Sequence, residues 1–246
     1  MNKRRIDSLL VERGLAESWA KAQALIMAGE VEVGGKTNIK PGTLVAEGVE
    51  ISIKKPSPFV GRGGIKLDFA LNEFKLDVSS KVAADIGAST GGFTDCLLKR
   101  GAARVYAVDV GYGQLDWSLR QDPQVVVLER VNARYPIPIT EKVDLATLDL
   151  SFISVEKVLP TVAKIVKEDG YIILLLKPQF EAKRGEVDKG GVIRSPFLHA
   201  RVLGRFINWI IRHGFRLMGL VSSPILGASG NREFFVLLKN SMRYAA

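Results

Sequence analysis

Short apolar runs alternate with stretches of helical periodicity over most of the chain after residue 80. The apolar runs predict strands at 82–86, 105–109, 125–128, 143–149, 171–177, 216–222 and 233–239, with helices in the intervals. Only a short loop separates the last two strands, so they are expected to pair antiparallel. The pattern therefore predicts an α/β fold, a Rossmann-like seven-stranded sheet that ends in an antiparallel hairpin.

A smaller unit precedes this sheet. Helical spacing of apolar residues appears twice, at Ile6, Leu9 and Leu10 before Gly14, and at Trp19, Ala22, Leu25 and Ile26 between Ser18 and Gly29. Ser18 is a predicted N-cap, and the two glycines are predicted helix ends. Alternation at Val31 and Val33 indicates a short strand, followed by a turn at Gly34 and Gly35.

Prolines at positions 56 and 58 indicate a linker after this unit. We therefore expect a small α+β domain at 1–55, a linker at 56–62 and the sheet domain at 63–246. About 55 residues can bury only a small core, which favours an accessory binding role for the first domain.

The composition limits which kinds of site and which cellular location the chain can have. The 246 residues include one cysteine, Cys96, and two histidines, which excludes a disulfide framework and a Cys/His metal site, so no metal is expected. The longest apolar run, 171–176, is far shorter than a membrane span, and no apolar signal region follows the charged N-terminus. A cytoplasmic protein without stable membrane insertion is expected.

The net charge of +9 is concentrated in residues 177–216, which carry 9 basic and 3 acidic side chains, a net of +6. This surplus indicates either a phosphate-binding surface or a solvated helix face, and we favour the first because it follows a candidate active strand. The stretch 197–215 is basic and amphipathic, and such helices can lie on membranes. A helix packed on the sheet with its arginines outward is the favoured interpretation.

The most specific motif closes the first predicted strand of the sheet. It reads Asp85-Ile86-Gly87-Ala88-Ser89-Thr90-Gly91-Gly92-Phe93, and Asp109 ends the next strand about twenty residues past the first glycine. Glycines let a backbone approach a nucleoside cofactor, and the acid accepts its ribose hydroxyls. The spacing G-x-x-x-G-G departs from the dinucleotide pattern, which favours S-adenosylmethionine (SAM) over NAD.

Cofactor contacts are expected from this loop and from the ends of the following strands. The predicted set is Asp85, Gly87, Ala88, Ser89, Thr90, Gly91, Gly92, Phe93, Asp109, Asn132 and Asp149.

Four charged residues stand beside apolar segments where a soluble domain rarely places charge. Lys66 follows a glycine-rich segment, Asp149 and Lys177 end the fourth and fifth predicted strands, and Glu233 opens the last. The carboxyl ends of parallel strands hold the ligands of such sheets. A snorkelling lysine is the alternative explanation for Lys177.

The ordered set Lys66, Asp149, Lys177 and Glu233, with the glycine loop, resembles the Lys-Asp-Lys-Glu tetrad of FtsJ/RrmJ-like ribose 2′-O-methyltransferases. Residues 5–10, 14–16, 22, 25–26, 29 and 31–36 resemble the S4 RNA-binding domain. The two together resemble the TlyA-like family, also named hemolysin A. One departure is the loop 88–93, which reads Ala-Ser-Thr-Gly-Gly-Phe where FtsJ-type loops often read Ala-Ala-Pro-Gly-Gly-Trp.

This resemblance implies SAM-dependent methylation of ribose 2′-hydroxyls, with cytidines of ribosomal RNA or ribosomal subunits as targets. A 2′-hydroxyl is a poor nucleophile that must be oriented and deprotonated, and we assign Lys177 as orienter and general base. A lysine acts as a base only when burial or a nearby cation lowers its pKa. Lys66 would supply that cation, whereas Asp149 and Glu233 favour the ammonium form, so the resting protonation of Lys177 stays open.

RNA contacts are expected from basic residues of both domains. The predicted set is Arg4, Arg5, Arg13, Lys21, Lys36, Arg62, Lys183, Arg184 and Arg194.

Two other functions compete with this prediction. The family name hemolysin suggests a membrane-active protein, although the chain has neither a span nor a signal. A non-catalytic RNA-binding or ribosome assembly factor is the second alternative, against which the complete tetrad argues.

Overall fold

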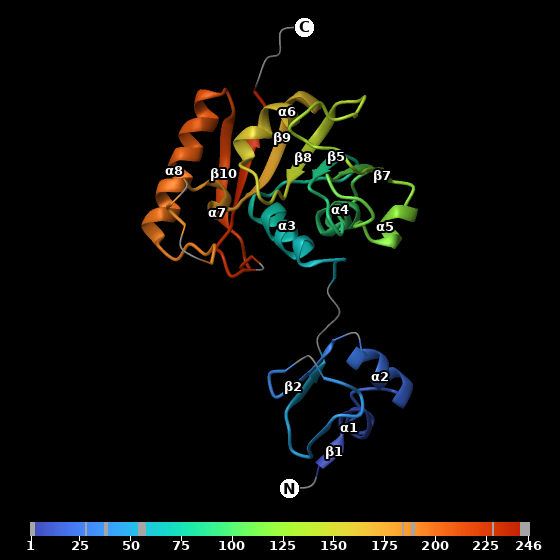
Figure 1. Ribbon diagram of the computed structural model, residues 1–246. Helices are drawn as coiled ribbons and strands as arrows, with labels where there is room; N and C mark the ends of the chain where they lie inside the picture. The colour runs from blue at the N-terminus through green and yellow to red at the C-terminus, as the bar shows by residue number, and fades with distance from the viewer. Residues whose placement is uncertain are drawn as a thin grey trace. The chain divides into compact units, whose positions relative to one another are not determined.

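The computed structural model describes residues 3–27, 29–36, 39–53, 58–183, 185–187, 190–227 and 229–241 (Figure 1). The chain divides into two compact units, 1–57 and 58–246. Arg184, a predicted RNA contact, and residues 54–57 around the predicted linker lie outside the described residues.

The first unit is a small α+β fold. Its elements are β1 (Lys3–Arg5), α1 (Ile6–Glu12), α2 (Trp19–Met27), β2 (Val31–Val33), β3 (Leu44–Ala46) and β4 (Ile51–Ile53). Strand β1 pairs antiparallel with β3, and β2 pairs antiparallel with β4. The predicted cap forms, because Ser18 Oγ accepts a hydrogen bond from Lys21 N. Its core joins both helices to β2 through Ile6, Leu10, Ile26 and Val31.

The second unit contains a seven-stranded sheet in the order β10-β11-β9-β8-β5-β6-β7. Its strands are β5 (Val82–Ile86), β6 (Arg104–Val108), β7 (Val125–Leu128), β8 (Val143–Leu148), β9 (Val166–Leu176), β10 (Arg216–Ser222) and β11 (Phe234–Lys239). The first five strands are parallel, and β11 pairs antiparallel with both β9 and β10. The predicted fold is confirmed, including its terminal antiparallel hairpin.

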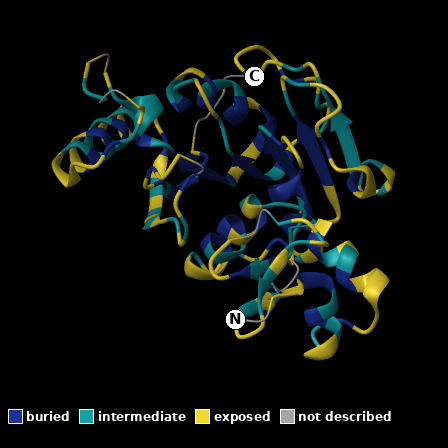
Figure 2. Ribbon diagram, turned by 60° about the horizontal axis from the view of Figure 1, so that its bottom comes forward, coloured by how far each residue is buried: buried dark blue, intermediate teal, exposed yellow. Residues whose placement is uncertain are grey.

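Helices cover the sheet through two separate apolar clusters. The helices are α3 (Arg62–Glu73), α4 (Gly92–Lys99), α5 (Trp117–Gln121), α6 (Leu159–Ile165), α7 (Pro178–Glu181) and α8 (Pro196–Arg212), with a 3₁₀ turn η1 (Val155–Lys157). Apolar side chains of α6 and α8 belong to one cluster, and those of α3 and α4 to the other. Cys96 is fully buried in the second cluster, as a small apolar side chain. The central strands β5 and β8 are mostly buried between these layers, whereas β10 at one edge of the sheet is not (Figure 2).

Helix α8 shows why its basic, amphipathic sequence does not require a membrane. Val202, Phe206 and Ile210 lie four residues apart, so they share one helix face, and all three are buried. Arg201 and Arg212 are exposed. The predicted helix packed on the sheet is therefore confirmed.

Strand direction places the charged residues at one edge. Parallel strands β5, β6, β8 and β9 all end on the same side of the sheet, which is where Asp109, Asp149 and Lys177 follow them. Phe234, at the start of the antiparallel β11, pairs with Leu176. Glu233, one residue earlier, therefore reaches the level of Lys177 at the same edge.

We expect Phe206→Ala to lower the free energy of unfolding by about 3–5 kcal/mol, because it empties a fully buried site in the larger cluster. Phe197→Ala is the matched control, since Phe197 is on the same helix but 83% exposed, and it should change stability by less than about 0.5 kcal/mol. Urea unfolding followed by circular dichroism measures both values. Equal losses from the two variants would contradict the packing of α8 on the sheet.

Candidate active site

The glycine loop begins with a backbone turn that only glycine fits. Gly87 has φ +87°, and a Cβ at this position would lie 2.6 Å from the backbone oxygen of Asp149. The amides of Gly87 and Ala88 both donate to Val108 O, at 2.8 and 3.1 Å. The loop is thus fixed between the ends of β6 and β8, and it directs the chain into α4.

Close packing holds the second half of the loop. A Cβ at Gly91 would lie 2.2 Å from Leu119 Cδ1, and a Cβ at Gly92 would lie 3.0 Å from Gly64 N. Gly64 lies in the first turn of α3, which carries Lys66 half a turn later. These two glycines therefore bring α5 and α3 against the loop, and the approach of α3 sets the position of Lys66.

Asp85 lies beneath the loop. Its carboxylate is fully buried and accepts hydrogen bonds from Thr94 Oγ1 at 2.8 Å and Thr147 Oγ1 at 3.1 Å. Burial raises the pKa of this carboxyl to about 7, although the two hydroxyl groups lower it. Asp85 is not among the residues that line the cavities described below, so its predicted contact with a cofactor stays a prediction.

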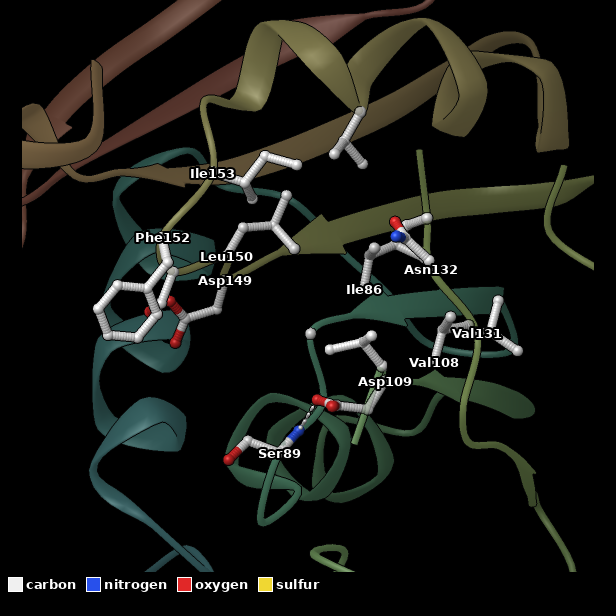
Figure 3. A pocket seen from close by; sticks show the side chains of 15 residues that line it. Ile86, Ser89, Val108, Asp109, Val131, Asn132, Asp149, Leu150, Phe152 and Ile153 are labelled. Atoms are coloured by element: carbon white, nitrogen blue, oxygen red, sulfur yellow. Dashed lines mark hydrogen bonds between the residues drawn. The ribbon is translucent and has the colours of Figure 1, made fainter. Parts of the chain in front are cut away.

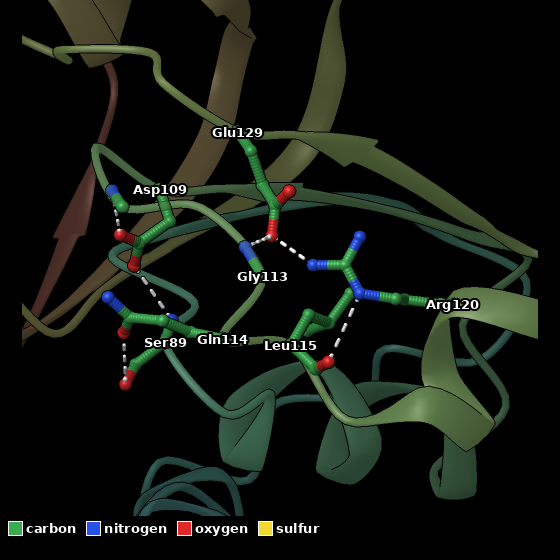
Figure 4. A network of polar contacts seen from close by, with 8 residues as sticks. Ser89, Asp109, Gly113, Gln114, Leu115, Arg120 and Glu129 are labelled. Atoms are coloured by element: carbon green, nitrogen blue, oxygen red, sulfur yellow. Dashed lines mark hydrogen bonds and ion pairs between the residues drawn. The ribbon is translucent and has the colours of Figure 1, made fainter.

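Asp109 supports the loop and faces a cavity at the same time. Its Oδ2 accepts a hydrogen bond from Ser89 N at 2.8 Å, and its Oδ1 accepts one from Gly111 N at 2.7 Å (Figure 4). Each carboxylate oxygen keeps a further lone pair for another donor. The side chain lies beside the cavity shown in Figure 3, so it can accept hydrogen bonds from two adjacent hydroxyl groups of a ligand.

Two hollows meet at the glycine loop. The larger has a volume of about 380 Å³ and is lined by Asp109, Asn132, Leu150, Phe152 and Ile153, among others (Figure 3). The smaller, of about 120 Å³, runs along the loop past Ala88, Thr90, Gly92 and Phe93. They share Gly87, Ser89 and Asp149, so Asp149 stands at their junction.

The four charged residues form two ion pairs. Lys66 Nζ lies 2.6 Å from Glu233 Oε2, and both side chains are less than one-tenth exposed. Lys177 Nζ lies 2.7 Å from Asp149 Oδ1. The Lys177 side chain also donates to Ser151 Oγ at 2.9 Å. Asp149 Oδ1 is buried, and its partner among the described residues is Lys177 Nζ.

Two neighbouring residues escaped the sequence analysis. Ser151 binds Lys177, and Phe152 has a side chain 91% exposed and a backbone φ of +63° at the rim of the larger hollow. Both lie within three residues of Asp149. Their position just after an acid at a strand end is the sequence signal that could have identified them.

The predicted RNA contacts differ in their surroundings. Arg4 pairs with Glu12, Arg5 with Asp7, and Arg13 donates to the carbonyls of Val49 and Glu47. Arg62 is exposed and donates to Leu226 O. Four further candidates are exposed: Lys21, Lys36, Lys183 and Arg194. The arginines of the first unit therefore have structural partners within it.

Comparison with known families agrees with this geometry. Residues 59–240 match the family model for FtsJ-like methyltransferase, and residues 4–51 match the S4 domain. Among the described residues, no helix is long and apolar enough to cross a membrane. No group of three or more His, Cys, Asp and Glu side chains there could hold a metal ion.

Similar proteins share nearly the whole length of the chain. A Bacillus subtilis protein named "Putative rRNA methyltransferase YqxC" is 48% identical over 96% of this chain and 85% of its own. The "16S/23S rRNA (cytidine-2'-O)-methyltransferase TlyA" of Mycobacterium tuberculosis is 46% identical over 96% and 89%. A solved structure, "Putative hemolysin from Streptococcus thermophilus", aligns with a TM-score of 0.75 at 42% identity over 97% and 89%.

We expect the buried Asp85 to make the protein less stable as pH rises from about 4 to about 7. Its folded pKa is raised above the unfolded value of 3.8, so the folded state binds this proton more tightly and loses that advantage as pH rises. Asp85→Asn should remove this part of the pH dependence, which thermal unfolding at several pH values measures. Asp77→Asn, at an exposed carboxyl, is the control. An unchanged pH profile in Asp85→Asn would contradict the assignment.

Proposed function

Because the chain belongs to the FtsJ-like methyltransferase family and carries an S4 domain, we propose that it methylates the 2′-hydroxyl of a cytidine ribose in ribosomal RNA. The observation that carries the proposal is the pair of lysine–carboxylate contacts, Lys66–Glu233 and Lys177–Asp149, at the ligand-binding edge of the sheet. Residues 1–55 would serve as the RNA-binding domain, 56–62 as linker and 63–246 as the catalytic domain. Such an enzyme works where ribosomes are, in the cytoplasm.

The two hollows suit the two halves of SAM, which supplies an activated methyl group on a sulfonium. Asp109 would accept the ribose hydroxyls in the larger hollow, where Asn132 is available to the adenine. The backbone from Gly87 to Phe93 would hold the methionine part in the smaller one. Asp149 stands between the two, and its carboxylate, paired with Lys177, would add negative charge beside the sulfonium.

Lys177 would orient the ribose hydroxyl and, in its neutral amine form, accept the proton as the oxygen bonds to the methyl carbon and the carbon–sulfur bond breaks. Asp149 and Ser151 fix the position of Lys177 Nζ from two directions. The buried ion pair of Lys66 with Glu233 would complete the frame from α3 and β11. These residues would thus act mainly by positioning the reacting groups, which is what a displacement at a methyl carbon requires.

Several exposed groups suit an RNA substrate. Phe152, which contacts the ring of Phe180, exposes most of its own ring at the rim of the larger hollow, and exposed rings stack on unpaired bases. Lys183 and Arg194 are exposed in the basic segment that follows Lys177. The S4 domain would add phosphate contacts of its own through Lys21, Lys36 and the arginines at positions 4, 5 and 13.

We expect Lys177→Ala to reduce methyl transfer by roughly 10²- to 10⁴-fold, because the variant lacks the group that orients and deprotonates the hydroxyl. SAM affinity should stay within about threefold of wild type, since Lys177 does not line either hollow. The measurement is transfer of radiolabelled methyl from SAM to isolated ribosomal subunits.

Lys164→Ala, at an exposed lysine on α6, is the matched control. Undiminished transfer by Lys177→Ala would refute the role of Lys177. If wild type binds SAM but labels no subunit, a non-catalytic assembly factor becomes the better explanation. Dye release from liposomes without SAM would instead favour the activity in the name hemolysin.

We expect Asp109→Ala to weaken SAM binding by at least about 10- to 100-fold, because even one hydrogen bond to a charged group contributes about 1.5–3 kcal/mol. Isothermal titration calorimetry measures the affinity, and Asp122→Ala is the control at the end of α5. A folded Asp109→Ala protein that binds SAM as tightly as wild type would remove Asp109 from the cofactor site.

A further inference from the structure

Two short segments, each of which begins at a tetrad residue, are joined by a series of contacts. One segment runs from Asp149 to Val155 and the other from Lys177 to Glu181. We propose that Glu181 is a positioning residue, which holds α7 against the first segment and so fixes the place of Lys177 Nζ. This inference rests on the proposed function, because it assigns Glu181 a part in the same methyl transfer.

Glu181 reaches the first segment with both carboxylate oxygens. Its Oε2 accepts a hydrogen bond from Ser154 Oγ at 2.6 Å, and its Oε1 accepts one from Val155 N at 2.8 Å. Ser154 Oγ also accepts from Glu156 N, so the two side chains together cap the start of η1. The carboxylate of Glu181 is thus committed to this contact.

The contacts between the segments occur in chain order. Lys177 meets Asp149 and Ser151, the ring of Phe180 lies 5.2 Å from that of Phe152, and Glu181 meets the residues after Ile153. Lys177 and Glu181 are separated by one helical turn, at the first and last positions of this series. Loss of the last contact therefore frees the end of the helix that Lys177 begins.

Helix α7 needs such an anchor because it has only four residues. A helix this short does not hold its shape by its own hydrogen bonds. The segment it binds is better supported, since Val155 and Val158 are buried in the larger apolar cluster. Glu181 therefore links the short helix that follows Lys177 to the better supported segment that follows Asp149.

Loss of Glu181 is therefore expected to slow the chemical step and to leave SAM binding unchanged. Neither hollow is lined by Glu181, so its loss leaves the proposed SAM contacts in place. A displacement of a reacting group by about 1 Å can lower a rate by about 10²-fold. Glu181→Ala is expected to lower kcat by roughly 10- to 100-fold with little change in the KM for SAM.

Glu181→Gln provides the conservative rescue. The amide oxygen can accept from Val155 N, and the amide nitrogen can donate to Ser154 Oγ, so the shape of the contact is kept without its charge. This variant should retain kcat within about threefold of wild type. Glu186→Ala is the matched control, because Glu186 pairs with Arg205 on α8 rather than with the segment after Asp149, and its kcat should not change.

A second comparison tests whether Glu181 acts on kcat through its contact with Ser154. Ser154→Ala should also lower kcat, and the double variant Ser154→Ala/Glu181→Ala should be no slower than Glu181→Ala alone, because both changes break one contact. Thermal unfolding and SAM titration of every variant identify any that fail to fold. If the double alanine variant does not fold, the double variant Ser154→Ala/Glu181→Gln takes its place in the comparison.

The outcomes separate this inference from the function on which it rests. No transfer by wild type would overturn the proposed function itself. Active wild type with unchanged kcat in Glu181→Ala would overturn the positioning role alone. The same holds if Glu181→Gln, when folded, is as slow as Glu181→Ala, or if Glu181→Ala raises the KM for SAM without lowering kcat.

Discussion

The antiparallel pairing of β11 with β9 is the constraint on which the site depends. A parallel β11 would start at the opposite edge of the sheet and would carry Glu233 away from Lys177. Because β11 runs in reverse, Phe234 pairs with Leu176, and Glu233 meets Lys66 from α3 at the carboxyl edge. The terminal hairpin thus adds an acid to an edge that parallel strands alone supply with Asp109, Asp149 and Lys177.

Pairing explains how this edge tolerates so much charge. Isolated buried charges are strongly unfavourable, and even a buried ion pair adds little to stability because desolvation offsets attraction. The Lys66–Glu233 pair is almost fully enclosed, whereas the Lys177–Asp149 pair is partly exposed, and only Asp149 lines the hollows. We infer that the first pair sets geometry between α3 and β11, and that the second keeps a lysine available to substrate.

Repeating patterns in the sequence predicted the fold well, but contacts between distant residues could not be read from it. Apolar runs located all seven strands, although β9 begins at Val166, five residues before its predicted start, because polar residues 167–169 hid the extension. Strand-end position predicted Asp149, Lys177 and Glu233 as site residues, and the preceding glycine-rich segment predicted Lys66. The partners of Asp85 could not be predicted, since Thr94 and Thr147 come from separate elements. Ser151 and Phe152 carry no periodic signal and depend on the fold for their roles.

A count of charged residues also fails to show which of them pair with one another in the fold. The basic surplus after Lys177 suggested a broad phosphate-binding surface, yet Arg201 and Arg205 both pair with Glu186 within that segment. Ion pairs of this kind leave fewer basic side chains free to bind phosphate than the count of basic residues implies. Under the proposed function, Lys183 and Arg194 are the exposed candidates for RNA contact in this segment, because both are close in sequence to Lys177. The S4 domain of the same chain would supply a second site for RNA, so the proposal does not require a large basic surface on the catalytic domain.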